Sequence, residues 1–272
     1  MREGPTFRIL CIGGSDPRMG AGVEMDAAVC RALGFEPVVV PTLVSVQGPR
    51  GLESVRILPV EQAVHAIVRE LGEGVDAVKI GALGDHNMAE ALAQVLEPWA
   101  EELPIILDPV AQASKQAVPG VALNTPAGIA VMRAQLFPLA AVVTPNAAEY
   151  GSGEAYEFCR AVLRKGGHDG DEWVVDRLTT ILEEPLEFRR PRLPGATEVH
   201  GTGCAFATLV ACLMARCPGP EFACEEAGNI LHAWLAGPGL QNGSLVPPPT
   251  PRRDWPLSMF TSPNPGHSAN PD

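Results

Sequence analysis

The sequence predicts a three-layer α/β/α sandwich around a mainly parallel, doubly wound β-sheet. Three observations lead to this α/β fold class. Short apolar segments of strand length alternate with longer segments whose apolar residues recur at helical spacing. Polar or glycine-rich loops follow most of the apolar segments, as in sheets whose ligands bind beyond the carboxyl ends of parallel strands. A chain of 272 residues, 46% of them hydrophobic, can bury the core that this fold needs.

The alternation is regular from residue 7 to Asn146. A short apolar strand leads through a glycine-rich loop over 13–22 into a helix that ends at Gly34, since glycine favours the backbone conformation that closes a helix. The segments that follow alternate in the same way, which builds βαβ units with parallel strands. We expect strands over 7–12, 38–46, 77–80, 105–107 and 140–143, and helices over 60–71, 87–96 and 125–136.

The pattern is less regular after Asn146. Gly151 and Gly153 interrupt the segment before the next strand, so only a short helix fits there. From residue 238 onward the chain is dense in Pro, Gly, Ser and Asn, which predicts a single domain over 1–237 and a poorly ordered tail over 238–272. The remaining expected elements are a short helix within 147–159, a strand over 161–165, a hairpin of strands over 173–181 and 186–189, and helices from Cys204 and over 222–235.

The composition excludes several classes of function. The formal net charge is −12 and only 20 residues are Lys or Arg, whereas a nucleic-acid surface needs clustered cations. No run of about 18 apolar residues is free of charges and helix breakers, and the first residues lack the apolar core of a signal peptide. Seven cysteines without a C-x-x-C pair fit a reducing compartment and no zinc site. We expect a cytoplasmic protein that binds neither nucleic acid nor membranes.

The stretch His200-Gly201-Thr202-Gly203-Cys204 precedes an apolar run and is typical of a loop that opens a helix. Unpaired N–H groups and the positive end of the helix dipole make such a terminus an anion site. A cysteine in the first turn lies in the same field, which predicts a lowered thiol pKa and makes Cys204 a candidate proton acceptor. The alternative, a glycine-rich helix start with a buried structural cysteine, stays open at this point.

Six groups of residues occur in an order that resembles one family. They are Gly14-Ser15-Asp16-Pro17 with Gly20-Ala21-Gly22 and Asp26; Lys79-Ile80-Gly81; Asp108-Pro109-Val110; Thr144-Pro145-Asn146 with Glu149; Lys165-Gly166-Gly167-His168; and His200-Gly201-Thr202-Gly203-Cys204. In this order they are similar to the motifs of hydroxymethylpyrimidine/phosphomethylpyrimidine kinases of thiamine biosynthesis, which belong to the ribokinase superfamily. The resemblance extends over residues 7 to 236.

The resemblance implies a ribokinase-like fold and an ATP-dependent kinase. Cys204 resembles the base that takes the proton of the substrate hydroxyl, beside an anion hole formed by Gly201, Thr202 and Gly203. Thr202 and Gly203 also resemble nucleotide contacts, and Lys165 resembles the lysine on the phosphate side of the family's site. Lys165 could instead be an exposed lysine at the end of a strand. We interpret His200 as a loop histidine without a catalytic role.

The resemblance also implies Mg²⁺ as the metal ion. Asn146 and Glu149 resemble the pair that organises this ion, directly or through water, and oxygen ligands suit it. Asn146 is in addition an expected nucleotide contact. Asp108 is a weaker candidate ligand, because the Asp-Pro sequence by itself explains an extended strand end.

A pyrimidine substrate is expected to lie against Gly14, Asp26, Gln47, Ala82 and Val110. A carboxylate and an amide can satisfy the ring nitrogens and the exocyclic amine of an aminopyrimidine. Asp26 could instead be a solvated residue on a helix face. We also expect a homodimer.

Three departures from the family leave alternatives open. Ala82 stands where family members commonly carry methionine, which enlarges the pocket beside the ring; the segment between Asn146 and Lys165 is shorter than usual; and the tail lacks the usual Gly-His-Gly ending. The leading hypothesis is a kinase of hydroxymethylpyrimidine and its monophosphate. The second is a kinase of pyridoxal or a related hydroxymethyl-bearing heteroaromatic. The third is a catalytically silent relative that binds such a ligand.

Overall fold

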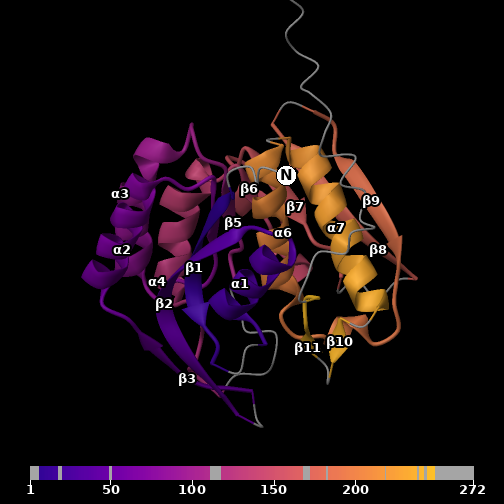
Figure 1. Cartoon of the computed structure of the whole chain (residues 1–272), viewed down its shortest axis with the longest axis horizontal. Coiled ribbons are helices and arrows are strands. Elements are labelled where there is room, and N and C mark those ends of the chain that lie inside the picture. Colours follow the sequence, from indigo (N-terminus) through magenta and orange to yellow (C-terminus); the bar gives the residue numbers. More distant parts are fainter. Residues whose placement is uncertain are drawn as a thin grey trace, which may run out of the picture.

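A nine-stranded β-sheet forms the centre of the protein (Figure 1). The structure is a computed structural model that describes residues 6–17, 20–48, 51–110, 118–167, 172–181, 183–217, 219–237, 239–241 and 244–248. The strands of the sheet are β1 (Arg8–Ser15), β2 (Glu36–Gly48), β3 (Gly51–Ile57), β4 (Ala77–Ile80), β5 (Ile105–Leu107), β6 (Val142–Val143), β7 (Ala161–Arg164), β8 (Trp173–Thr180) and β9 (Leu186–Pro191).

The strand order is β3-β2-β1-β4-β5-β6-β7-β8-β9. Pairing is parallel from β2 through β1, β4, β5 and β6 to β7, and it is antiparallel where β3, β8 and β9 extend the two edges. The central strands are continuous apolar runs because helices bury both of their faces. Residues 9–12 of β1 and 105–107 of β5, for example, are fully buried.

Helices cover both faces of the sheet, and each layer has its own hydrophobic core (Figure 1). One layer consists of α1 (Gly22–Ala32), α6 (Thr202–Arg216) and α7 (Pro220–Ala236), and the other of α2 (Val60–Glu73), α3 (His86–Leu96) and α4 (Pro126–Val131). This arrangement confirms the predicted three-layer α/β/α sandwich with a mainly parallel sheet. No helix in the described ranges combines the length and the apolar character needed to span a membrane.

Several boundaries differ from those predicted. β3 was not expected, because its exposed polar residues, Ser54 and Arg56, alternate with partly buried ones and hide the strand in the sequence. The predicted helix over 125–136 remains α-helical only over Pro126–Val131 and continues as a wider π-helical turn over Met132–Leu136. The predicted hairpin over 173–181 and 186–189 is confirmed as β8 and β9.

The segment between β6 and β7 contains little secondary structure. Its α-helix, α5 (Ala147–Tyr150), has four residues, and a single 3₁₀ turn follows over Glu154–Tyr156. Gly151 and Gly153 both have positive φ angles, 54° and 86°; Gly151 ends α5 and Gly153 precedes the 3₁₀ turn, so the two glycines interrupt the segment as the sequence predicted.

The beginning of the predicted tail forms an element that the sequence did not indicate. β10 (Leu240–Gln241) and β11 (Ser244–Leu245) pair as a small antiparallel hairpin. Leu245 is 1% exposed and belongs to the core of the α6 layer. Its N–H donates a hydrogen bond to the carbonyl oxygen of His200 at 3.2 Å. Residues 249–272 of the predicted tail lie outside the described residues.

Candidate active site

A cavity of about 540 Å³ opens at the carboxyl ends of the parallel strands. Asp16, Gly81, Asp108 and Lys165 line it, and each follows directly after the end of a strand. Ligands of doubly wound sheets bind at this edge. All the site residues predicted from the sequence line the cavity except Gln47, whose backbone lies in β2 but whose side chain is outside what the structure describes.

The cavity contains the start of α6. Gly201 precedes this helix with φ 85°, and a Cβ at Gly201 would lie 2.1 Å from the carbonyl oxygen of Gly20. Only glycine therefore fits this turn. No side chain caps the first turn of α6, so its N–H groups are available to an anion in the cavity. This geometry confirms that the helix begins at the predicted motif.

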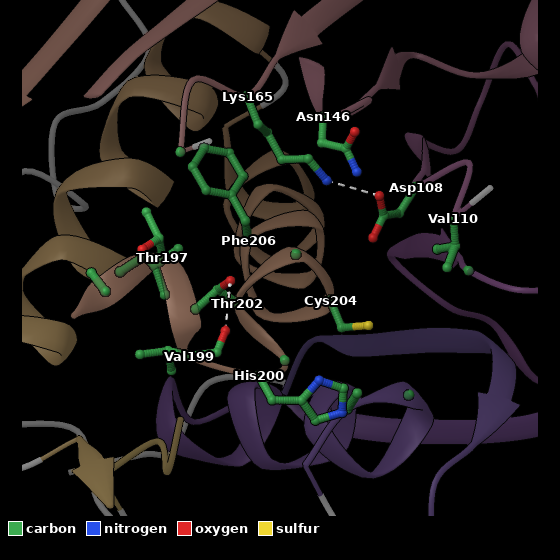
Figure 2. A pocket seen from close by; sticks show the side chains of 18 of the residues that line it. Asp108, Val110, Asn146, Lys165, Thr197, Val199, His200, Thr202, Cys204 and Phe206 are labelled. Atoms are coloured by element: carbon green, nitrogen blue, oxygen red, sulfur yellow. Dashed lines mark hydrogen bonds and ion pairs between the residues drawn. The ribbon is translucent and has the colours of Figure 1, made fainter. Parts of the chain in front are cut away.

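Lys165 lies beside this helix start. Its Nζ donates to Oδ1 of Asp108 at 2.9 Å (Figure 2). A Cβ on Gly203 would lie 3.6 Å from the same Nζ and 3.7 Å from the Asp108 carboxylate. Burial disfavours the cation, but Asp108 raises the pKa of Lys165 above its ordinary value, so the lysine is charged. The structure thus places a cation next to an uncapped helix N-terminus, an arrangement suited to a phosphate group.

A second lysine, Lys79, lies deeper in the same site. It is 1% exposed in the centre of β4, and its Nζ lies 3.0 and 2.9 Å from the two carboxylate oxygens of Asp26. The Asp26 carboxylate also accepts a hydrogen bond from the Thr208 hydroxyl at 2.8 Å. Burial raises the pKa of Asp26, and Lys79 opposes that shift. Burial also disfavours the cation of Lys79, but Asp26 and nearby groups raise the pKa of Lys79 above its ordinary value. Asp26 is therefore half of a buried ion pair at the wall of the cavity, not a solvated residue on a helix face.

Lys79 belongs to one of the six motifs in the sequence, but the sequence analysis predicted no role for it. A signal was present, because lysine is rarely buried and this one stands in a central strand whose other residues are apolar. Such a lysine needs a buried anion, and the sequence did not identify Asp26 as that anion.

The pKa of Cys204 corrects one prediction. The thiol was expected to have a lowered pKa because of its position in the first turn of α6. Desolvation by the surrounding protein instead raises the pKa of Cys204 to about 11; Lys79 lowers it, but the carboxylates of Asp26 and Asp108 raise it further. Burial therefore outweighs the favourable charge of Lys79, and the protonated thiol is the dominant form at neutral pH.

Asn146 and Glu149 have an additional structural explanation. The N–H of Glu149 donates to Oδ1 of Asn146 at 2.9 Å, and the N–H of Asn146 donates to Oε2 of Glu149 at 2.8 Å. This is the capping box of α5. Among the described residues no group of three or more His, Cys, Asp or Glu side chains is placed to hold a metal ion. The predicted Mg²⁺ role of Asn146, Glu149 and Asp108 stays a prediction.

Two further polar side chains that the sequence did not assign support the cavity. Oδ1 of Asp176 on β8 accepts a hydrogen bond from the N–H of Gly166 at 2.9 Å, and its Oδ2 lies 2.7 Å from Arg190 on β9. The pair thus holds the loop that follows Lys165.

His200, interpreted as a loop histidine, is buried with its Nε2 3.5 Å from Oδ2 of Asp16.

This combination of sheet, helix terminus and buried lysines defines a phosphotransferase with a ribokinase-like α/β fold. More particularly, the chain belongs to the phosphomethylpyrimidine kinase family, whose sequence profile matches residues 16–152 and 154–248. Relatives in sequence support the family, and solved structures of similar shape support the fold.

Two relatives are named hydroxymethylpyrimidine/phosphomethylpyrimidine kinase. The one from Streptomyces coelicolor is 35% identical over 227 residues, which cover 76% of this chain and 81% of the relative. The one from Escherichia coli is 32% identical over 248 residues, covering 84% and 90% of the two chains.

Two solved structures share the fold. A pyridoxal kinase from Staphylococcus aureus in complex with AMP-PCP and pyridoxal superposes with a TM-score of 0.76 at 23% identity, covering 90% of this chain and 93% of the other. A phosphomethylpyrimidine kinase from Clostridium difficile superposes with a TM-score of 0.68 at 22% identity, covering 85% of this chain and the whole of the other.

Proposed function

We propose that this enzyme phosphorylates hydroxymethylpyrimidine and then its monophosphate, with ATP as the phosphoryl donor. The observation that carries the proposal is the convergence of Lys165, Lys79 and Cys204 on the uncapped N-terminus of α6, in a chain of the phosphomethylpyrimidine kinase family. Phosphoryl transfer needs cations and N–H groups at the transferred group and a base for the acceptor hydroxyl, and these residues supply both.

The reaction requires one bond to form and one to break. The acceptor oxygen bonds to the γ-phosphorus of ATP, the bond from that phosphorus to the β–γ bridging oxygen breaks, and ADP leaves. In this proposal the N–H groups of Gly201, Thr202 and Gly203 bind the phosphoryl oxygens, and Lys165 offsets their charge. Cys204 accepts the hydroxyl proton once its own proton has left, a loss that the Lys79 cation favours.

The two substrates would occupy different parts of the cavity. Thr197, Val199 and Phe206 lie on the Thr202 side, away from Val110 (Figure 2). Apolar walls of this kind suit the adenine of ATP. The acceptor ring would lie at the other end, where Gly14, Ala82 and Val110 line the cavity.

Mg²⁺ fits the oxygen-bearing side chains of this site. Asp108, Asn146 and Glu149 line the cavity near Lys165, and few hard oxygen ligands from the protein suit an ion that also binds phosphates. When bound, Mg²⁺ would neutralise charge on the ATP phosphates. Asp108 also accepts the hydrogen bond from Lys165.

Pyridoxal is the second candidate acceptor. Ala82 is small, so it leaves room beside the ring, and one of the structural neighbours is a pyridoxal kinase with pyridoxal bound. The two acceptors share a hydroxymethyl group on a heteroaromatic ring, so the same catalytic groups would serve both.

The proposal is tested by measuring ADP formation from ATP, in the presence of Mg²⁺, with hydroxymethylpyrimidine, its monophosphate or pyridoxal as the acceptor. We expect kcat/KM for hydroxymethylpyrimidine and its monophosphate to exceed that for pyridoxal by at least about tenfold, the effect of one hydrogen bond. Preference for pyridoxal would establish the second candidate. Absence of turnover with all three would leave a silent ligand-binding relative.

A matched pair of cysteine variants tests the base. Cys204→Ser should lower kcat by about 10²–10⁴-fold, the usual contribution of a general base, with little change in ATP affinity. Cys217→Ser, at an exposed cysteine, is the control and should behave as the wild type. The predicted homodimer is tested separately by sedimentation velocity.

A further inference from the structure

Asn124 is a buried asparagine whose side chain joins two loops at the cavity. It is 2% exposed. Its Oδ1 accepts hydrogen bonds from the N–H groups of Leu83 at 2.8 Å and Gly84 at 2.9 Å. Its Nδ2 donates to the carbonyl oxygens of Val110 at 2.9 Å and Pro109 at 3.4 Å. The amide thus accepts two hydrogen bonds and donates two, a pattern that no other side chain of this shape reproduces.

One of these contacts holds a strained residue. Val110 has φ 33°, and in the described part of the chain it is the one residue other than glycine with a positive φ. A β-branched residue rarely adopts this conformation, so the surroundings must stabilise it. The hydrogen bond from Asn124 acts on the carbonyl group of Val110 itself.

The other loop is fixed from two sides. The Thr42 hydroxyl on β2 donates to the carbonyl oxygen of Ala82 at 2.7 Å. The N–H of Thr125 donates to the carbonyl oxygen of Gly84 at 2.8 Å. Ala82 is therefore anchored to the sheet independently of Asn124. The position of Val110 relative to Ala82 then depends on the side chain of Asn124.

We propose that Asn124 is a positioning residue that sets the separation of Ala82 and Val110, the two walls of the acceptor pocket. Asn124 does not touch the acceptor, since Val110 and the neighbouring Leu123 line the cavity while its own side chain is buried behind them. It acts by holding Val110 in its strained conformation. The inference rests on the proposed function, because it assumes that the acceptor ring lies between these walls.

Asn124→Asp tests the proposal with almost no change of shape. The aspartate keeps both acceptor positions but places an oxygen opposite two carbonyl oxygens, so it releases Val110 without releasing Leu83 or Gly84. We expect the KM for the acceptor to rise about tenfold, the effect of one lost hydrogen bond, and the KM for ATP to change by less than about twofold. A purely structural role would affect both KM values together.

Val110→Gly provides the second arm, because glycine adopts a positive φ without strain. In the Val110→Gly protein, Asn124→Asp should raise the acceptor KM by less than about threefold, which measures the coupling of the two residues. The effects of Asn124→Asp and Val110→Gly on the free energy of unfolding in urea should show the same coupling, and this measurement requires no enzymatic activity. Asn87→Asp, at an exposed asparagine at the start of α3, is the matched control and should leave both KM values unchanged.

The outcomes separate the two proposals. A wild-type enzyme that uses none of the acceptors refutes the proposed function, and the unfolding cycle then still decides whether Asn124 stabilises Val110. An active wild type whose acceptor KM is insensitive to Asn124→Asp, or equally sensitive with and without Val110→Gly, refutes the role of Asn124. If Asn124→Asp does not fold, Asn124→Ser, which releases both loops without introducing a charge, should still raise the acceptor KM more than the ATP KM.

Discussion

At the scale of single residues, the site concentrates positive charge inside an acidic protein. The chain has a net charge of −12, yet two lysines lie near the start of α6. Each forms an ion pair with one carboxylate, Lys79 with Asp26 and Lys165 with Asp108. These pairs let a triphosphate bind without a basic surface, because the cations and the helix N–H groups act locally. The same burial that strengthens these charges makes the Cys204 thiol a weak acid.

The pH dependence of Cys204 alkylation tests this electrostatic balance. Only the thiolate reacts, so with a pKa of about 11 the rate with iodoacetamide should rise about tenfold per pH unit between pH 7 and 9.5. The measurement belongs in a Cys217→Ser background, since Cys217 is exposed, Cys204 is half-buried and the remaining five cysteines are buried. A rate that levels off below pH 9 would contradict the raised pKa.

Loss of the Asp26 carboxylate should destabilise the protein. Asp26→Ala leaves the Lys79 cation buried without its partner, which costs about 3–5 kcal/mol in the free energy of unfolding. Removing both charges in Asp26→Leu/Lys79→Met should recover most of that loss. Urea unfolding measures both, with Glu187→Ala on the exposed hairpin as a control of little effect. Equal stability of Asp26→Ala and the wild type would show that the pair is not ionised.

At the scale of elements, α6 is held at its start by parts of the chain far apart in sequence. Gly20 packs against Gly201, and β11 bonds to His200 immediately before the helix. The hairpin of β10 and β11 is therefore a support for the start of α6. This role explains why Leu245 is buried in the core although Ser244 and Val246 on either side of it are not.

Shortening Leu245 should loosen that support. Leu245→Ala should lower the free energy of unfolding by about 2 kcal/mol or more, as for other buried leucines, and raise the KM for ATP because the loop before α6 loses its anchor. Val246→Ala is the matched control, since Val246 is the next residue and 40% exposed. Identical effects of the two substitutions would contradict a specific role for Leu245. Unfolding and steady-state kinetics are the measurements.

At the scale of the whole molecule, the two ends of the cavity differ in how much structure surrounds them. The end proposed for the acceptor lies among the central parallel strands and is fixed by buried hydrogen bonds such as those of Asn124. The end proposed for the nucleotide is lined in part by α5, which has only four residues, and by the antiparallel strands β8 and β9 at the sheet edge.

This asymmetry predicts weak nucleotide binding. With so short a helix beside it, ATP should bind with a dissociation constant of about 0.1–1 mM, at the upper end of common substrate values. Calorimetry with a non-hydrolysable ATP analogue and Mg²⁺ measures it, and chelating the metal should weaken binding further. Micromolar affinity would show that the shortened segment does not limit the nucleotide site.

The sequence alone determined the features that depend on neighbouring residues. The alternation of strands and helices, the start of α6 at Gly201-Thr202 and the interruption at Gly151 and Gly153 all follow from local periodicity and from what glycine permits. The order of the motifs identified the family in the same way.

The tertiary structure decided the features that depend on burial and on distant partners. Asp26 meets Lys79 across 53 positions and Thr208 across 182, so no local pattern could reveal the ion pair. The pKa of Cys204 was predicted in the wrong direction, because the dipole of its own helix is visible in the sequence whereas its desolvation is not. Asn124 escaped notice for the same reason: its function lies in four hydrogen bonds to backbone groups, and these exist only once the two loops have been brought together.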